Sequence, residues 1–374
     1  MGLDETVLKS EEHVMLELRA LYKKYGYSQF KMSKFEEYDL YVRNKDFLVG
    51  DGVITFTDTD GKLLALKPDV TLSIIQNSKD MPGVTQKVYY NENVYRISGS
   101  THTFKEIMQT GLECIGDIDV YSLSEVVMLA AKSLAAVSGT YLLDLSHMGI
   151  VSPLVDAVPA SQERKAHILR CIGEKNVHEI REICRECAAP DALAEKLALL
   201  VGTYGRPEDV FPVMRGLCTQ GQARSALHEL ESVVTALGAA GLERGLHIDF
   251  SVVNDMNYYS GIVFRGFVDG VPEGILSGGQ YDGLMHRMGR KSGAAGFAVY
   301  LDLLERLPHR PRGYDADTLL LYEADTDVCE LMKAVGALTG EGSVLAEKTV
   351  PEGIEVRRIV RLRDGRLEIL EQHD

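Results

Sequence analysis

The stretch FKEIMQTGLECIG, residues 104–116, alternates like a β-strand but carries its polar residues in an unusual place. Successive side chains of a strand point to opposite faces, so Gln109, Gly111 and Glu113 share one face. Neither face is cleanly apolar, whereas a simple half-buried strand has one face that is. Either these polar side chains face solvent, which is the commoner situation for a glutamine and a glutamate, or they line a small polar pocket. In the second case the floor of the pocket needs Gly111 to carry no side chain.

The surrounding sequence predicts further strands with antiparallel partners. Residues 87–97 and 106–116 are separated by a polar, glycine-containing loop and form one expected pair. The dipeptide Asp60-Gly61 lies between two strand-like runs and is typical of a hairpin closed by a type I′ turn. Strand-like runs return between residues 247 and 279, and residues 10–25 and 120–137 have helical periodicity. The pattern indicates an α+β fold in which helices flank an antiparallel sheet.

Two changes in the sequence pattern divide the chain. From about residue 150 to 245 the sequence is helical with few β-branched runs, which predicts an all-helical insertion. Pro308 and Pro311 mark a linker, and the residues beyond it alternate between strand-like and helical runs. We therefore expect one main domain over residues 1–312, interrupted by the insertion, and a small α/β domain over residues 313–374.

Composition restricts the kinds of partner. The chain has 374 residues, with 40 basic against 55 acidic side chains and a formal net charge of −15, which argues against a broad nucleic-acid surface. No run approaches the ~20 apolar residues of a membrane span, and the N-terminal residues lack the apolar core of a signal peptide. The close pair Cys184 and Cys187 has no second pair to complete a zinc site. We expect a cytoplasmic protein without a membrane partner and without a bound metal.

Six segments, taken in order, resemble the catalytic domain of histidyl-tRNA synthetase, a class II aminoacyl-tRNA synthetase, over about residues 10–307. Residues 25–41 are similar to class II motif 1, residues 94–116 to motif 2 and residues 295–304 to motif 3. Three family-specific signatures are matched by LALKPDVT (64–71), VVNDMNYYSG (252–261) and GGQYDGL (278–284). Any one of these matches is weak, but six in order are specific. The resemblance implies a class II synthetase-like antiparallel sheet flanked by helices.

The resemblance also implies a histidine pocket. By motif matching, Gln109 and Glu113 point at a bound histidine, Asp69 and Thr71 hold its ammonium group, and Tyr258 and Tyr259 shape the site of its imidazole. These residue types suit the chemistry, since a zwitterion with an imidazole needs carboxylate acceptors, a neutral amide or hydroxyl, and aromatic walls with a polar tip.

The departures from the family concern ATP rather than histidine. Arg96 keeps the leading arginine of motif 2 and is a remnant of the phosphate site, but Ser98 stands where an acidic residue is expected. In motif 3, Leu303 replaces the ATP-binding arginine and Tyr300 replaces a glycine, although a shifted alignment would bring in Arg306. In the histidine signature, Asn254 replaces the catalytic arginine. Adenylate formation needs cations on the phosphates, so we expect histidine binding without activation, no catalytic residue and no cofactor.

This combination resembles the regulatory subunits of ATP phosphoribosyltransferase, which act in the first step of histidine biosynthesis. The resemblance implies a short-form catalytic subunit as partner, feedback inhibition by L-histidine, and a homodimer within a hetero-oligomer. A tRNA partner is not expected, because the C-terminal segment is shorter than an anticodon-binding domain. Two alternatives remain open: an active histidyl-tRNA synthetase that uses ATP and tRNA, and a pseudo-synthetase that binds histidine or tRNA in another pathway.

Overall fold

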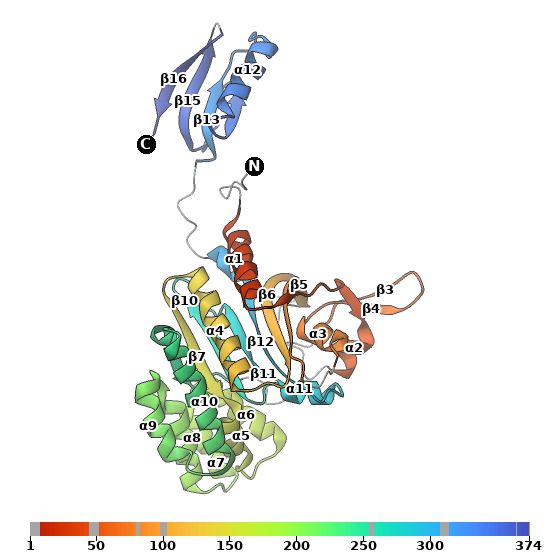
Figure 1. The fold of residues 1–374 in the computed structure, drawn as a ribbon, viewed down its shortest axis with the longest axis vertical. Helices are drawn as coiled ribbons and strands as arrows, with labels where there is room; N and C mark the ends of the chain where they lie inside the picture. The colour runs from red at the N-terminus through yellow and green to blue at the C-terminus, as the bar shows by residue number, and fades with distance from the viewer. Residues whose placement is uncertain are drawn as a thin grey trace. The chain divides into compact units, whose positions relative to one another are not determined.

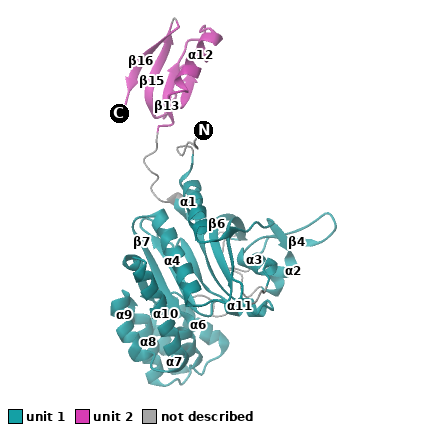
Figure 2. Ribbon diagram, in the orientation of Figure 1, with its two compact units in different colours: residues 1–307 teal, residues 308–374 magenta. Residues whose placement is uncertain are grey.

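The chain divides into two units, Met1–Leu307 and Pro308–Asp374, each of which is described by itself (Figure 2). The structure is a computed structural model that describes residues 8–44, 52–79, 83–97, 103–253, 258–306, 314–363 and 365–373. The first unit is built on a large sheet with helices, and the second is a small α/β unit.

Antiparallel pairing dominates the large sheet of the first unit (Figure 1). The predicted pair of strands is confirmed, because β5 and β6 pair antiparallel with Tyr90 opposite Gly111. Parallel pairs occur only toward the two edges of the described sheet, between β1 and β5 and between β7 and β9. In spatial order the described strands are β1 (Ser28–Gln29), β5 (Gln86–Ile97), β6 (Phe104–Gly116), β12 (Gly293–Tyr300), β11 (Leu276–Gln280), β10 (Ile262–Val268), β7 (Tyr141–His147), β9 (Leu246–Asp249) and β8 (Tyr204–Gly205).

Helices cover one face of this sheet almost completely. Helix α1 (Ser10–Lys24) and helix α4 (Val120–Val137) pack on the face to which Leu112 and Phe297 point (Figure 1). Helix α4 is the one helix among the described residues with the length and apolar composition of a membrane span. Because 61% of that window is buried inside the unit, α4 is a core helix.

The opposite face is covered only in part. Helix α3 (Thr71–Asn77) and helix α11 (Asp282–Arg287) pack there against β5, β6 and β12 and form a second core with Ile74, Tyr90 and Leu284. Because side chains alternate along a strand, the polar residues Gln109 and Glu113 of β6 lie on this partly covered face. The α+β architecture predicted from the sequence is confirmed, and it leaves room for a site beside α3.

The helical segment follows β7 directly. Its helices are α5 (Met148–Asp156), α6 (Gln162–Gly173), α7 (Val177–Glu186), α8 (Asp191–Gly202), α9 (Pro207–Leu217) and α10 (Gly221–Ala239). The segment is not entirely helical, because the short strand β8 pairs with β9 at the edge of the large sheet. A 3-10 turn, η3 (Glu243–Gly245), leads back into β9, and a second one, η4 (Leu301–Arg306), follows β12.

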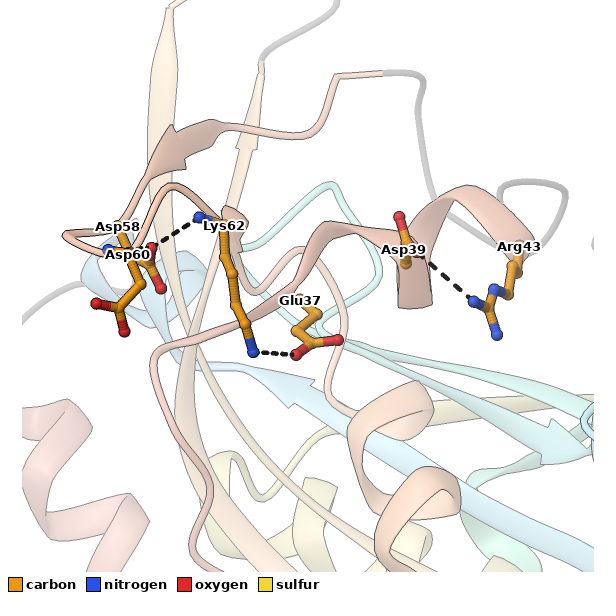
Figure 3. Close-up of polar contacts among 6 residues, drawn as sticks. All are labelled: Glu37, Asp39, Arg43, Asp58, Asp60 and Lys62. Atoms are coloured by element: carbon orange, nitrogen blue, oxygen red, sulfur yellow. Dashed lines mark hydrogen bonds and ion pairs between the residues drawn. The ribbon is translucent and has the colours of Figure 1, made fainter.

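A small three-stranded sheet projects beside α3. It consists of β2 (Phe35–Glu37), β4 (Leu63–Leu66) and β3 (Thr55–Thr57), with helix α2 (Tyr38–Arg43) after β2. The predicted hairpin around Asp60-Gly61 is confirmed, but its type I′ turn is wrong, because Gly61 has a positive φ and Asp60 does not. Instead, the Asp58 carboxylate accepts hydrogen bonds from the N–H groups of Asp60 and Lys62 and organises a longer loop, and Lys62 reaches Glu37 at 3.4 Å (Figure 3).

The second unit is a four-stranded sheet with one helix. Its strands lie in the order β14 (Val344–Glu347), β13 (Ala316–Leu321), β15 (Val356–Arg363) and β16 (Arg366–Gln372). Helix α12 (Val328–Leu338) packs on one face of the sheet through Ala334 and Leu338, against Leu320 and Val360. The predicted C-terminal hairpin is confirmed by the antiparallel pair β15 and β16, while Asp364 lies outside the described residues.

Candidate functional site

A polar cavity of about 420 Å³ opens on the partly covered face of the large sheet. This volume is within the usual range of small-molecule sites. Its walls come from β6, β12, β11 and β10, from the start of α3, and from the tyrosines that precede β10. All seven residues singled out from the sequence line this one cavity: Asp69, Thr71, Arg96, Gln109, Glu113, Tyr258 and Tyr259.

Glu113 is the most enclosed acid of the cavity, with a relative exposure of 2%. Its Oε1 accepts a hydrogen bond of 2.8 Å from the Thr71 hydroxyl, and its Oε2 accepts one from the Tyr281 hydroxyl. Gly296 lies opposite Glu113 in the register of β12 and β6, and a Cβ at Gly296 would overlap the carboxylate. The carboxylate is therefore fixed in position by two hydroxyl groups and by the absence of a side chain on the neighbouring strand.

Burial raises the pKa of Glu113 to about 8, despite the opposing effect of the two hydrogen bonds. The negative charge of Asp69 raises the pKa of Glu113 further. Desolvation is the largest cause, because a charged carboxylate loses more hydration than two neutral donors replace. A cationic group entering the cavity would favour the ionised form of Glu113, so the site is suited to binding a positively charged or proton-accepting ligand.

Gln109 offers a second polar group to the cavity. Its side chain is buried at 3% exposure, and within the described residues its amide has no hydrogen-bond partner. Because Gln109 lines the cavity, its amide is available to a ligand there. Gly111 does not leave the empty floor that we expected, because Tyr90 opposite it fills the space: a Cβ at Gly111 would lie 2.6 Å from the Tyr90 hydroxyl.

Three tyrosines form an aromatic wall around Glu113. The ring centroids of Tyr258 and Tyr259 are 4.6 Å apart, and those of Tyr258 and Tyr281 are 5.9 Å apart. Burial, followed by the nearby negative charges, raises the pKa values of Tyr258 and Tyr281 well above that of a free tyrosine. Their hydroxyl groups therefore stay protonated at neutral pH and can donate hydrogen bonds to a ligand or to Glu113.

Asp69 lies just before α3, and Arg96 at the end of β5 reaches the same place. The Asp69 carboxylate accepts a 2.9 Å hydrogen bond from the N–H of Leu72, and the Arg96 Nε donates a 2.9 Å hydrogen bond to the carbonyl of Pro68. Burial raises the pKa of Asp69, while the Leu72 N–H and the charge of Arg96 oppose this effect. Asp69 is thus a part-buried acceptor that an ammonium group could approach from the cavity.

The residues that depart from the synthetase pattern divide into two groups. Tyr300, which stands where motif 3 has a glycine, lines the cavity opposite Gln109 and shares a 2.8 Å hydrogen bond with Ser277. Leu303 is partly buried and packs against the core. The other two departures, Ser98 and Asn254, lie outside the described residues.

Among the cavity residues that were not predicted from the sequence are Tyr90, Tyr281 and Arg265. A signal for Tyr281 existed, because it belongs to the GGQYDGL segment that matches a family signature. Tyr90 lies opposite Gly111 on the strand that was expected to pair with β6. Arg265 is brought to the cavity by the pairing of β12 with both β6 and β11, which no local pattern reveals.

One group outside the cavity has metal-ligand chemistry. Possible ligand atoms of His167, Cys171 and Glu179 lie within 4.8 Å of one another. His167 and Glu179 already pair with each other at 2.8 Å, which accounts for their proximity without an ion. We assign no metal to this group.

Comparison with known proteins gives a consistent result. The sequence profile described as histidyl-tRNA synthetase matches residues 3–304. The chain is 27% identical over 317 residues to the ATP phosphoribosyltransferase regulatory subunit of Oceanobacillus iheyensis, covering 83% of this chain and 78% of the relative. It is 30% identical over 292 residues to the protein of the same name from Clostridium kluyveri, covering 76% and 74%.

A solved structure has the same fold. The crystal structure described as an ATP phosphoribosyltransferase regulatory subunit/histidyl-tRNA synthetase from Bacillus halodurans superposes with a TM-score of 0.76 at 23% identity. The match covers 94% of this chain and 93% of the other. The class II synthetase-like fold expected from the six segments is therefore confirmed.

Proposed function

The chain belongs to the histidyl-tRNA synthetase family, in its branch of ATP phosphoribosyltransferase regulatory subunits, and we propose that it binds L-histidine without activating it. In this proposal it is a non-catalytic subunit that conveys feedback inhibition by histidine to a separate catalytic subunit. The observation that carries the proposal is the meeting of Asp69, Thr71, Gln109 and Glu113 in one cavity from which the ATP-binding features of motif 3 are missing.

The cavity is chemically complementary to histidine. The imidazole fits the end where Glu113 is held by Thr71 and Tyr281, because a carboxyl group that ionises on contact with a base can pair with an imidazole nitrogen. The ammonium group fits the Asp69 carboxylate and the Gln109 carbonyl, which supply a charged and a neutral acceptor. Tyr258 and Tyr259 supply aromatic surface for the flat ring.

At motif 3 the same cavity differs from the pattern of a synthetase that activates histidine. Tyr300 occupies space that a glycine leaves open in the synthetase pattern, and Leu303 is an apolar residue at the position of the ATP-binding arginine. Adenylate formation requires preorganised cations on the transferring phosphate. A chain that keeps the proposed histidine-binding groups but not the motif 3 arginine is suited to sensing histidine.

The proposed partner follows from the relatives. They are named regulatory subunits of ATP phosphoribosyltransferase, so we propose a short-form catalytic subunit of that enzyme as the partner of this chain. We further propose a homodimer at the centre of the assembly, formed through the segment that is similar to motif 1, residues 25–41.

Two measurements on the purified chain test binding and activation separately. Isothermal calorimetry should detect L-histidine binding, and histidine-dependent exchange of pyrophosphate with ATP should not exceed a buffer control. Exchange above that control would contradict the proposal and would favour an active synthetase. An absence of histidine binding would contradict it as well.

A further inference from the structure

An arginine that belongs to none of the matched signatures borders the cavity at the end away from the acids. Arg265 lies in β10 and lines the cavity together with Ser277, Tyr300 and Gly274. Glu113 and Gln109 lie on β6, and strands β12 and β11 separate β6 from β10. Three interstrand steps of about 4.8 Å give roughly 14 Å between the backbones of β6 and β10. Arg265, Gln109 and Glu113 all line the cavity that lies between these strands.

The floor between the two ends is open because the intervening residues are small. In the register of the sheet, Arg265 is opposite Ser277, Ser277 is opposite Ala298, and Gly296 is opposite Glu113. Directly opposed residues of antiparallel strands share a face. Arg265 and Glu113 therefore point to the same side of the sheet, across a floor of glycine, alanine and serine.

Arg265 is held by packing rather than by an acid. A Cβ at Gly274 would lie 2.9 Å from the Arg265 Cγ, so the absence of a side chain there makes room for the arginine stem. The guanidinium carbon lies 5.6 Å from the centroid of the Phe267 ring. No ion pair of Arg265 occurs within the described residues. The positive charge of Arg265 acts on the neighbouring acid in the register, Asp144 on β7, and opposes the rise in the pKa of Asp144 that burial causes, but no hydrogen bond joins the two side chains.

Arg96, the other arginine of the cavity, is already engaged. Its Nε donates to the Pro68 carbonyl, and its charge acts on Asp69. Arg265 keeps its hydrogen-bond donors, and beside it the Ser277 and Tyr300 hydroxyls form a pair that can also donate. The cavity thus has acids at one end and an available guanidinium at the other, which matches the polarity of a zwitterion.

We propose that Arg265 binds the α-carboxylate of the amino acid held in this cavity and so selects amino acids over analogues that lack the carboxylate. This inference rests on the proposed function. The planar guanidinium can donate two parallel hydrogen bonds to a carboxylate, which is a stronger and more directional contact than an ammonium or a neutral amide makes. In this proposal Arg265 of β10 supplies the cation that the family has at the sequence position of Asn254.

The test compares two ligands on four proteins. The ligands are L-histidine and its amino-alcohol analogue L-histidinol, in which CH2OH replaces the carboxylate. The proteins are the wild-type chain, Arg265→Gln, Arg265→Lys, and Arg244→Gln as a control for the loss of one positive charge from an exposed site outside the cavity. Binding is measured by calorimetry, and circular dichroism checks that each variant is folded.

We expect the wild type to prefer L-histidine by roughly 10- to 150-fold, the range expected for one charge-assisted contact. Arg265→Gln should weaken the binding of L-histidine alone and so bring the ratio of the two affinities, L-histidine to L-histidinol, close to one. Arg265→Lys should keep part of the preference, and Arg244→Gln should keep all of it. If Arg265→Gln were unfolded, the ratio for Arg265→Lys would decide.

Three results would overturn the inference. A wild type that binds both ligands equally contradicts it at once. An unchanged ratio in Arg265→Gln, or an equal loss for both ligands, would contradict it while leaving histidine binding intact. A wild type that binds neither ligand would contradict the proposed function, and the inference would fall with it.

Discussion

At the residue scale, Glu113 shows how opposing effects combine in this site. Burial raises the pKa of its carboxyl group, and the hydrogen bonds from two hydroxyl donors lower this pKa. Burial has the larger effect, so the carboxyl group of the unliganded chain is mostly protonated at neutral pH. A ligand that brings a basic nitrogen reverses the balance. In the proposed function, this makes Glu113 the residue whose state depends most on histidine.

Replacing Glu113 by glutamine should therefore weaken histidine binding. The substitution keeps the volume and one acceptor but removes the charge that pairs with the ligand, which costs ~1.5–3 kcal/mol, or roughly 10- to 150-fold in affinity. Calorimetry on Glu113→Gln measures the effect, and Glu106→Gln on the same strand is the control, because Glu106 is exposed and does not line the cavity. An unchanged affinity would place Glu113 outside the binding site.

The raised pKa of Glu113 also predicts how stability depends on pH. The folded pKa of about 8 lies above the ordinary value of 4.5, so between these values the folded chain keeps a proton that the unfolded chain has lost. The free energy of unfolding must then fall as the pH rises through this window. Glu113→Gln lacks this titration. The difference in the free energy of unfolding between the variant and the wild type, measured by urea unfolding, should therefore shift in favour of the variant by on the order of a few kcal/mol from pH 5 to 8. Parallel curves for the two proteins would refute the assigned protonation state.

At the element scale, the site is produced by strand register. The alternation of β6 is a local property, so the common face of Gln109 and Glu113 could be predicted from the sequence. Their neighbours could not, because Gly296 and Tyr300 come from a strand about 180 residues further along the chain. Pairing across such distances depends on the whole sheet. Gly111 was misjudged for a different reason: its partner strand was predicted, but the side chain of Tyr90 on that strand fills the space that Gly111 leaves.

In the turn at Asp60-Gly61, a side-chain hydrogen-bond acceptor produces a different loop from the one that the dipeptide predicts. Asp60-Gly61 is a strong signal for a two-residue turn, yet the Asp58 carboxylate holds two backbone N–H groups and stabilises a longer loop (Figure 3). The motif matches were more informative than propensity for the cavity, because they identified residues from three separate segments that the structure brings together. The roles of these residues as histidine ligands stay a prediction.

The close approach of β12 to β6 gives a test at this scale. Gly296→Ala places a methyl group where the Glu113 carboxylate lies, so the carboxylate or the strand must move. Overpacking of this kind costs about 1–3 kcal/mol in the free energy of unfolding, and histidine affinity should fall with it. The matched control is Gly238→Ala in α10, where a Cβ meets nothing within 4 Å and should stabilise the helix by about 0.5–1 kcal/mol. Equal effects of the two substitutions would contradict the packing account.

At the scale of the whole molecule, the chain combines the unit that contains the cavity with a second unit that has a core of its own. The cavity lies entirely within the first unit, on one face of a sheet whose other face is covered by α1 and α4. The second unit has a separate core formed by α12 and its sheet. In the proposed function, histidine bound in the first unit changes the activity of another polypeptide.

The measurement that tests this claim most directly is the activity of the reconstituted ATP phosphoribosyltransferase. The short-form catalytic subunit of the same organism is assayed alone, with this chain, and with its Glu113→Gln variant, over a range of L-histidine concentrations. We predict that the wild-type chain makes the activity sensitive to histidine, and that the variant shifts half-inhibition to concentrations roughly 10- to 150-fold higher. Inhibition that is the same with the wild type, with the variant and without either chain would contradict the account.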